Sequence, residues 1–165
     1  MSTLLLPNSE LVAVGWLSLV PGFTNAMIGT TLPRDEMSWT ASGFVKVGPV
    51  VGGSPNPYNP QANPVLGIDC YAVRASRATP TTAPTVSNKP PWGQAAQLAE
   101  QIRQACYQLM YSGSPRRIAM PAPGYAHANV QSAVLLTEPR RMPGDVASYA
   151  RYTFDLRLTW VAEAN

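Results

Sequence analysis

The final stretch of the chain contains an unbroken alternation of apolar and polar side chains, and this pattern constrains the fold more than any other feature. The apolar members are Tyr152, Phe154, Leu156, Leu158 and Trp160, and the residues between them are Arg151, Thr153, Asp155, Arg157 and Thr159. Successive side chains of a strand point to opposite faces, so the run predicts a strand buried on one face. Such strands are typical of antiparallel or mixed sheets. We therefore expect an α+β fold with a mixed, largely antiparallel sheet of about four to six strands and two main helices packed on one face.

Two segments have the apolar spacing of helices that would cover this sheet. Asn8 is a suitable N-cap for the first helix, which Pro21–Gly22 ends. Its apolar positions at helical spacing are Leu11, Val14 and Leu17, with Trp16 beside them. The second helix is expected from about Trp92 to Met110, and its apolar stripe consists of Ala95, Leu98, Ile102, Ala105 and Leu109.

Shorter apolar runs predict the other strands. They cover residues 27–32, 43–47, 65–73, 117–120 and 130–137, with a polar turn region at 33–42 that contains Trp39 and a loop at 121–129. Residues 48–64 and 75–88 are rich in Pro, Gly, Thr and Ser, and we expect two long loops there because proline removes a ladder donor. Long loops without secondary structure are usually functional or disordered. Residues 1–165 are expected to form a single domain.

Composition favours a protein that is buried among neighbours. Only 13% of the residues are charged, about half of the ~25% that is typical of soluble domains, while 17 are Pro and 12 are Gly. The net charge is +3, but the cations are scattered rather than gathered in a basic run, which disfavours a dedicated duplex-binding protein. Residues 1–6 lack a basic export signal, and the apolar segment 11–20 is shorter than the ~20 residues that span a bilayer. Neither export nor membrane anchoring is expected.

The residue types of enzymes and metal sites are present without their spacing. Cys70 and Cys106 have no CxxC or Cys/His cluster around them, and we expect both to be reduced thiols. Pairing Cys106 with His127 would suggest a small cysteine hydrolase, but the simpler interpretation is a buried cysteine and a loop histidine. The acidic residues do not match a known loop of oxygen ligands, and Gly52–Gly53 does not open a helix as a phosphate cradle would. No catalytic residue, metal or cofactor is predicted.

Several short motifs occur in an order that points to one family. The opening helix over residues 10–22 is followed by GTTLP at 29–33, KPPWG at 89–93 and TEPRRMPGDVASYARYTFD at 137–155. In this order the sequence closely resembles the tail terminator proteins of siphophages that infect actinobacteria, and the resemblance covers nearly the whole chain. None of these motifs is a catalytic or metal-binding signature.

The resemblance implies a minor tail protein in the virion, at the junction of tail and neck, that is assembled in the host cytoplasm. Such a protein forms a homohexameric ring that caps the tail tube, stops its polymerisation and joins the tail to the head. Its partners would be copies of itself, the major tail tube protein and the head–tail stopper, with genomic DNA passing through the lumen without sequence-specific binding. A head–tail connector or stopper of the neck is the nearest alternative.

Five residues are candidates for contacts with such partners. Arg140, Arg141 and Asp145 lie in the EPRR–PGD segment, which is expected to be a loop. They would bind a neighbouring subunit, line the DNA channel, or form an internal Arg–Asp pair in a solvated loop. Tyr58 and Trp92 are candidate aromatic anchors, since aromatic residues concentrate binding energy at interfaces, although each could equally pack on its own domain.

Overall fold

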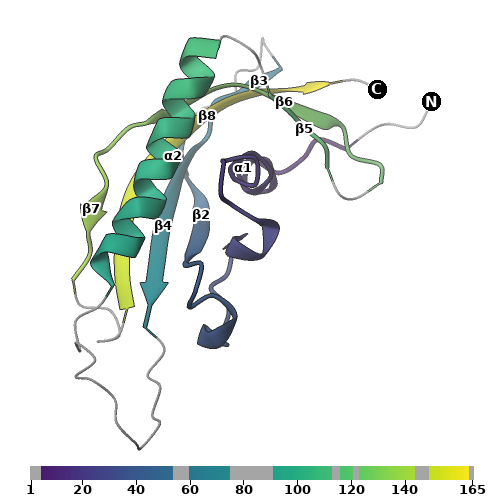
Figure 1. The fold of residues 1–165 in the computed structure, drawn as a ribbon. Coiled ribbons are helices and arrows are strands. Elements are labelled where there is room, and N and C mark those ends of the chain that lie inside the picture. The colour runs from purple at the N-terminus through teal and green to yellow at the C-terminus, as the bar shows by residue number, and fades with distance from the viewer. Residues whose placement is uncertain are drawn as a thin grey trace, which may run out of the picture.

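A computed structural model describes residues 5–53, 60–74, 91–112, 116–120, 123–143 and 149–163. The chain is α+β, with two α-helices beside one bent, mixed sheet (Figure 1). The helices are α1 (Ser9–Leu17) and α2 (Trp92–Ser112), and two short 3-10 turns are η1 (Asn25–Met27) and η2 (Glu36–Ser38). The strands are β1 (Ile28–Gly29), β2 (Phe44–Gly52), β3 (Gln61–Ala62), β4 (Val65–Val73), β5 (Arg116–Ile118), β6 (His127–Leu135), β7 (Arg140–Arg141) and β8 (Tyr149–Glu163).

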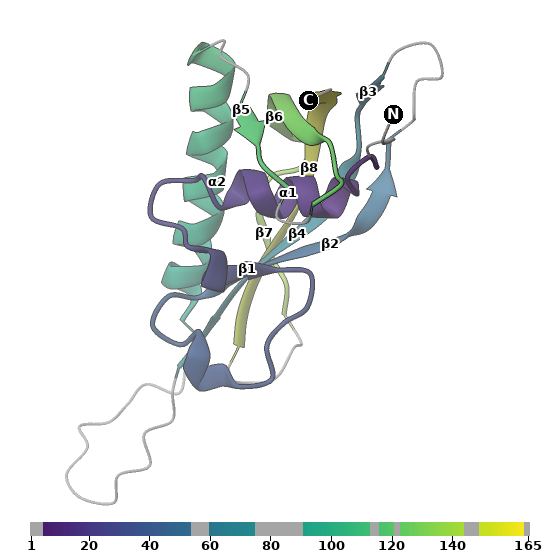
Figure 2. The same ribbon diagram turned by 90° about the vertical axis from the view of Figure 1, so that its right-hand side faces the viewer.

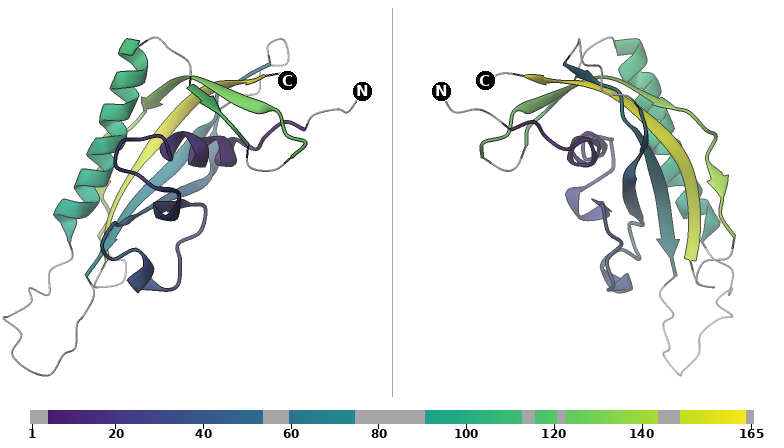
Figure 3. Two further views of the ribbon diagram at one scale, coloured as in Figure 1. Left: turned by 45° about the vertical axis from the view of Figure 1, so that its right-hand side comes forward. Right: turned by 180° about the vertical axis from the view of Figure 1, so that it is seen from behind.

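β8 is the strand around which the sheet is built. The order β1-β2-β4-β8-β6-β5 places it between β4 and β6, and the short strands β3 and β7 pair with its two halves. All of these pairs are antiparallel except β1 with β2, which are parallel. The expected mixed, largely antiparallel sheet is therefore confirmed. β8 bends strongly along its length (Figure 3).

The alternation that predicted β8 divides its side chains as expected. Phe154, Leu156, Leu158 and Trp160 are buried, whereas the residues between them lie on the face away from the helices. Leu66 and Ile68 of β4 join the same core cluster as residues of both helices, so α1 and α2 cover one face of the sheet. In Figure 2 the short helix α1 lies across the direction of α2.

The second helix and the β4 strand are found where the sequence placed them. α2 begins at Trp92, and all five members of its predicted stripe are buried. β4 has the predicted bounds, with Leu66, Ile68, Cys70 and Ala72 fully buried on one face. No helix in the described part of the chain is long and apolar enough to cross a bilayer.

The first helix is confirmed, but its predicted stripe is only partly confirmed: Leu17 and Trp16 are buried, Val14 is half-buried and Leu11 is exposed. Asn8 is the N-cap, and its Oδ1 accepts a hydrogen bond of 2.7 Å from the backbone N–H of Glu10. The buried side chains are Val12, Ala13, Trp16 and Leu17, whereas Leu11 is 45% exposed. Apolar residues occupy nearly every position of this helix, so their spacing does not identify the buried face.

The Pro- and Gly-rich segment 48–64 is not a loop throughout. β2 continues to Gly52, and β3 pairs with β8 at Gln61–Ala62. The register of β2 against β4 shifts between Val47 and Val50, around Pro49, because a bulge tolerates the missing N–H of a proline. Residues 54–59 of this segment, and the whole expected loop 75–88, lie outside the described residues.

Other boundaries also differ from the prediction. The strand expected at 27–32 is reduced to β1, two residues long, and β6 begins at His127 inside the expected loop 121–129. The turn region 33–42 forms η2 and buries Trp39, which is 1% exposed. Trp39 packs with Phe44, Tyr71 and Val73 in a second cluster, which explains why so polar a segment is ordered.

Candidate interaction surface

The EPRR segment forms an edge strand rather than the expected loop. Arg140 and Arg141 make up β7, and their register partners in β8 are Thr153 and Tyr152. The backbone N–H of Met142 then donates to the carbonyl oxygen of Arg151 at 3.0 Å. Two adjacent strand residues point to opposite sides, so the pairing with β8 directs the two arginines differently.

Arg141 joins the start of α2. Its guanidinium carbon lies 4.6 Å from the ring centroid of Trp92, which is a cation–π contact. The Trp92 ring in turn meets Tyr152 edge to face, with centroids 6.2 Å apart. Trp92 therefore packs on its own domain, one of the two interpretations that the sequence left open, although it is only half-buried.

Arg140 is exposed at the same edge. Within the described ranges no hydrogen bond, ion pair or ring contact involves its side chain. Asp145 and Tyr58 lie outside the described residues, so the proposed Arg–Asp pair and the proposed tyrosine anchor stay predictions. Of the five candidates, the structure brings Arg141 and Trp92 together and leaves Arg140 facing solvent.

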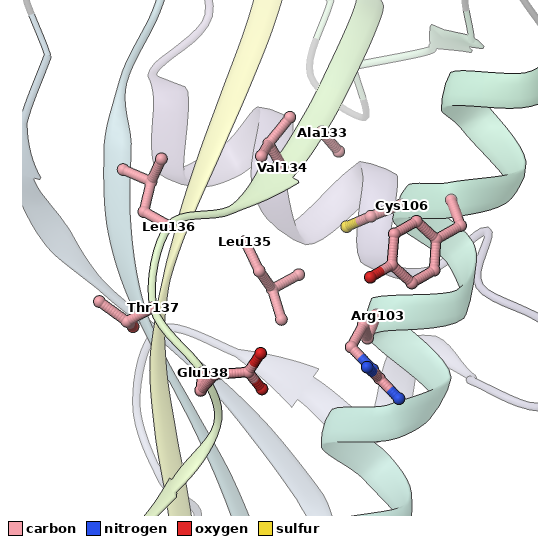
Figure 4. A pocket seen from close by; sticks show the side chains of 9 residues that line it. Arg103, Cys106, Ala133, Val134, Leu135, Leu136, Thr137 and Glu138 are labelled. Carbon is pink, nitrogen blue, oxygen red and sulfur yellow. The ribbon is translucent and has the colours of Figure 1, made fainter.

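A groove continues this edge between α2 and the end of β6, and we call it the α2–β6 groove (Figure 4). Its volume is about 290 Å³, and it is lined by Arg103, Cys106, Tyr107, Ala133, Val134, Leu135, Leu136, Thr137 and Glu138. A second hollow of about 240 Å³ shares Arg103 and Glu138 with it and reaches Tyr152 beside β7. The groove and the arginine edge therefore form one continuous surface.

Charged side chains stand at the rim of the α2–β6 groove, and apolar ones line its floor. Arg103 donates from Nε and Nη2 to the carboxylate of Glu100 at 2.8 and 2.9 Å, and this bond raises the pKa of Arg103 further. In Figure 4 the carboxylate of Glu138 points toward Arg103 while Leu135 points into the gap. Tyr107 is 45% exposed beside them. An apolar floor with a charged rim is the usual anatomy of a protein contact.

Sequence reasoning missed this groove. Tyr107 lies off the buried stripe of α2, and an exposed aromatic residue at such a position is the signal that was present. Leu135 and Glu138 carried no separate signal, because their approach to α2 depends on the bend of β6 and on the path of the chain into β7. The interface prediction named the motif next to the groove, not the groove.

The cysteine and histidine pair considered from the sequence does not assemble a nucleophile. Cys106 is buried on α2, and burial raises the pKa of its thiol to about 12, so the thiol is protonated at neutral pH. His127 begins β6 opposite Glu163, and no hydrogen bond joins it to Cys106 among the described residues. Burial raises the pKa of Cys70 as well. The described side chains contain no group of three or more His, Cys, Asp or Glu that could hold a metal.

Comparison with known proteins adds no relative to this picture. The sequence matches no family model and no curated protein. The candidate surface is therefore defined by its own geometry: an exposed arginine edge, a stacked Arg141–Trp92 pair, and an apolar groove with a charged rim. This arrangement can bind another protein surface through apolar burial and through arginine contacts with carboxylates.

Proposed function

We propose that this chain is a phage tail terminator, a structural protein whose ring caps the tail tube, stops its growth and joins the tail to the neck. In this proposal the chain acts by contact with copies of itself, with the tube protein and with the stopper, and performs no catalysis. The proposal originates in the ordered motifs of the sequence. The fold and the candidate surface are compatible with it.

One structural observation supports the proposal in addition to the sequence resemblance. Two of the resemblance motifs, KPPWG and TEPRR, are 44 residues apart when counted from Gly93 to Thr137, and they meet where Arg141 stacks on Trp92. The two motifs meet at one exposed edge, beside a groove with an apolar floor. Together they form a single surface that another protein could contact. This convergence supports the assignment of that edge to assembly.

The physics of an open polymer explains why such a protein is needed. A tube of stacked rings exposes at its growing end the same surface that each earlier ring used, so the contact itself does not limit length. A terminator must match that end on one side and present a different face on the other. The low charge of this chain, 13% of its residues, limits repulsion between closely packed copies.

Deleting the gene tests the proposal directly. We expect lysates that contain heads without tails and free tubes of non-uniform length when examined by negative-stain electron microscopy. Complementation with the wild-type gene should restore tailed particles, and His127→Ala should complement equally well because no chemistry is assigned to that imidazole. Tailed particles of normal length in the deletion strain would contradict the proposal.

A different outcome would favour the alternative function. Full-length, uniform free tails beside tailless heads indicate that termination is intact and that joining has failed, which is the phenotype of a head–tail stopper. The position of the gene separates the same alternatives. A terminator gene is expected immediately before the gene for the tail tube protein, and a stopper gene nearer to the capsid gene.

A further inference from the structure

The outer side of α1 is apolar and uncovered. Val12, Ala13, Trp16 and Leu17 pack on the sheet, but Leu11 and, just beyond the helix, Leu19 are 45% and 47% exposed. A helix that is apolar on every side is normally buried on every side. Leu11 on α1 and Leu19 just beyond it are therefore apolar side chains that their own chain leaves exposed.

This outer side forms one wall of a groove, which we call the α1–β5 groove. The groove has a volume of about 480 Å³ and is lined by Leu11, Val14, Gly15, Ser18, Leu19, Asn25, Arg117, Ile118, Ala119 and Met120. Most of these side chains are aliphatic, and Arg117 is the charged one among them. The guanidinium of Arg117 uses Nε to donate to Glu163 at 2.9 Å, while 60% of the side chain stays exposed.

The α2–β6 groove has complementary properties. It offers an exposed aromatic ring at Tyr107, an apolar floor at Leu135, and the carboxylate of Glu138 at its rim. One surface is thus mainly apolar with the cation Arg117 at its edge. The other is aromatic and aliphatic, and its rim carries Arg103, which is paired with Glu100, and the exposed anion Glu138. Apolar burial and opposite charges at the rim are the two features that specify a protein contact.

The two grooves lie on different sides of the molecule. α1 and β5 face the viewer in Figure 2, whereas α2 and β7 lie farther back, and the views in Figure 3 agree. Because the two grooves share no lining residue and face different sides, one copy can use both at once, each with a different neighbour. A contact of this heterologous kind produces rings where the rotation closes. A symmetric dimer through α1 would instead bring Arg117 against Arg117.

We propose that the α1–β5 groove receives the α2–β6 face of a second copy of this chain. Leu11 and Leu19 of one copy cover Tyr107 and Leu135 of the next, and Arg117 approaches Glu138. This contact rests on the proposed function, in which the chain forms a ring. It specifies the two faces that the ring would use.

Two blocking variants test the contact. Leu11→Glu places a carboxylate in the first turn of α1, where an acidic side chain is favourable for the helix, so folding should be preserved. Tyr107→Glu alters the other face at an exposed position of α2. An unpaired carboxylate in a buried contact weakens association by at least ~100-fold. Each variant alone should therefore be monomeric in analytical ultracentrifugation at concentrations where the wild type associates.

Mixing the two variants gives the decisive measurement. Each variant keeps the face that the other has lost, so an equal mixture has one intact contact and should form dimers and nothing larger. Met37→Glu, at a side chain that is 69% exposed on η2 and outside both grooves, is the matched control and should associate like the wild type. Leu19→Glu repeats the block of the α1–β5 groove if Leu11→Glu proves unstable to heating.

The outcomes separate this inference from the proposed function. A wild-type chain that stays monomeric at about 1 mM, a concentration at which contacts of roughly 4 kcal/mol are half-formed, overturns the self-contact. So does a mixture that remains monomeric although the wild type associates, or a blocking variant that associates normally. In each of these cases the deletion phenotype in lysates still decides whether the chain terminates tails.

Discussion

The two helices lie on the same sheet but differ in how completely their own chain covers them. α2 runs for 21 residues with one buried stripe, and its other side carries polar residues such as Gln97 and Gln104. α1 runs for nine residues, and both its inner and its outer sides are apolar. Apart from the exposed Tyr107, α2 therefore has the pattern of an ordinary surface helix, whereas α1 has the composition of a buried one.

This difference divides the molecule into a part that supports folding and a part that remains free for contact. Apolar surface gains roughly 25 cal/mol for each Å² removed from water, whether the cover comes from the same chain or from another. For the buried stripe of α2 this gain is realised on folding. For Leu11 and Leu19 it is still obtainable on association. Substitutions in the two helices should accordingly affect different measurements.

The largest expected effect is on stability and comes from the buried stripe of α2. Ile102 is fully buried in the main core, so Ile102→Ala should lower the free energy of unfolding by about 2–5 kcal/mol. Leu11→Ala on the outer side of α1 is the matched change and should stay within about 0.5 kcal/mol. Urea denaturation of both variants measures the contrast. Equal losses would show that the outer side of α1 is part of the fold.

The helices also show why some of the fold was predictable from sequence and some was not. The α2 stripe and the alternation in β8 were identified correctly because polar residues mark the opposite faces of these elements. The buried face of β4 was also predicted, although Asp69 is the polar residue on its other face, where Tyr71 and Val73 are buried too. α1 has few polar residues to mark an outer side, and its predicted stripe combined the buried Leu17 and Trp16 with the exposed Leu11. A periodic pattern locates a buried face only where another face is polar.

Non-local contacts explain the other failures. Gly48, Pro49 and Gly52 disfavour a strand at residues 48–52, but pairing with β4 extends β2 through bulges past Pro49. Arg140–Arg141 reads as a loop, yet β8 is long enough to pair with it beyond the end of β6. For the candidate surface, Trp92 and Arg141 were named separately, but their stacking depends on the distance between α2 and that edge. Local sequence does not encode such distances.

A smaller effect distinguishes the helices by one glycine in each. A Cβ on Gly15 of α1 would lie 2.3 Å from Cγ2 of Ile118 in β5, whereas a Cβ on Gly93 of α2 would meet nothing within 4 Å. Gly15→Ala should therefore destabilise the protein by about 1–3 kcal/mol through overpacking, offset in part by the helix propensity of alanine. Gly93→Ala should stabilise it by up to about 1 kcal/mol.

Thermal unfolding of the two alanine variants gives the measurement, with opposite shifts as the expected result. For a chain of this size 1 kcal/mol corresponds to a change in Tm of about 2–4 °C. A stabilised Gly15→Ala would mean that β5 moves away from α1 easily. The α1–β5 groove would then be less rigid than its packing indicates.

The smallest effect concerns the start of α2, where two adjacent arginines are expected to behave differently. Arg141 stacks on Trp92 within the chain, so Arg141→Ala removes a cation–π contact worth about 0.5–1 kcal/mol at an exposed site. Arg140 is exposed and has no such contact among the described residues, so Arg140→Ala should change stability by less than about 0.5 kcal/mol. Arg141→Lys keeps the charge but not the planar guanidinium, and its stability should fall between those of the wild type and Arg141→Ala.

If Arg140 contacts a partner, Arg140→Ala should instead reduce the yield of tailed particles in complementation at an unchanged Tm. Equal losses of Tm for both alanine variants would show that the stacking on Trp92 does not distinguish them, and that the edge strand depends on the two side chains alike.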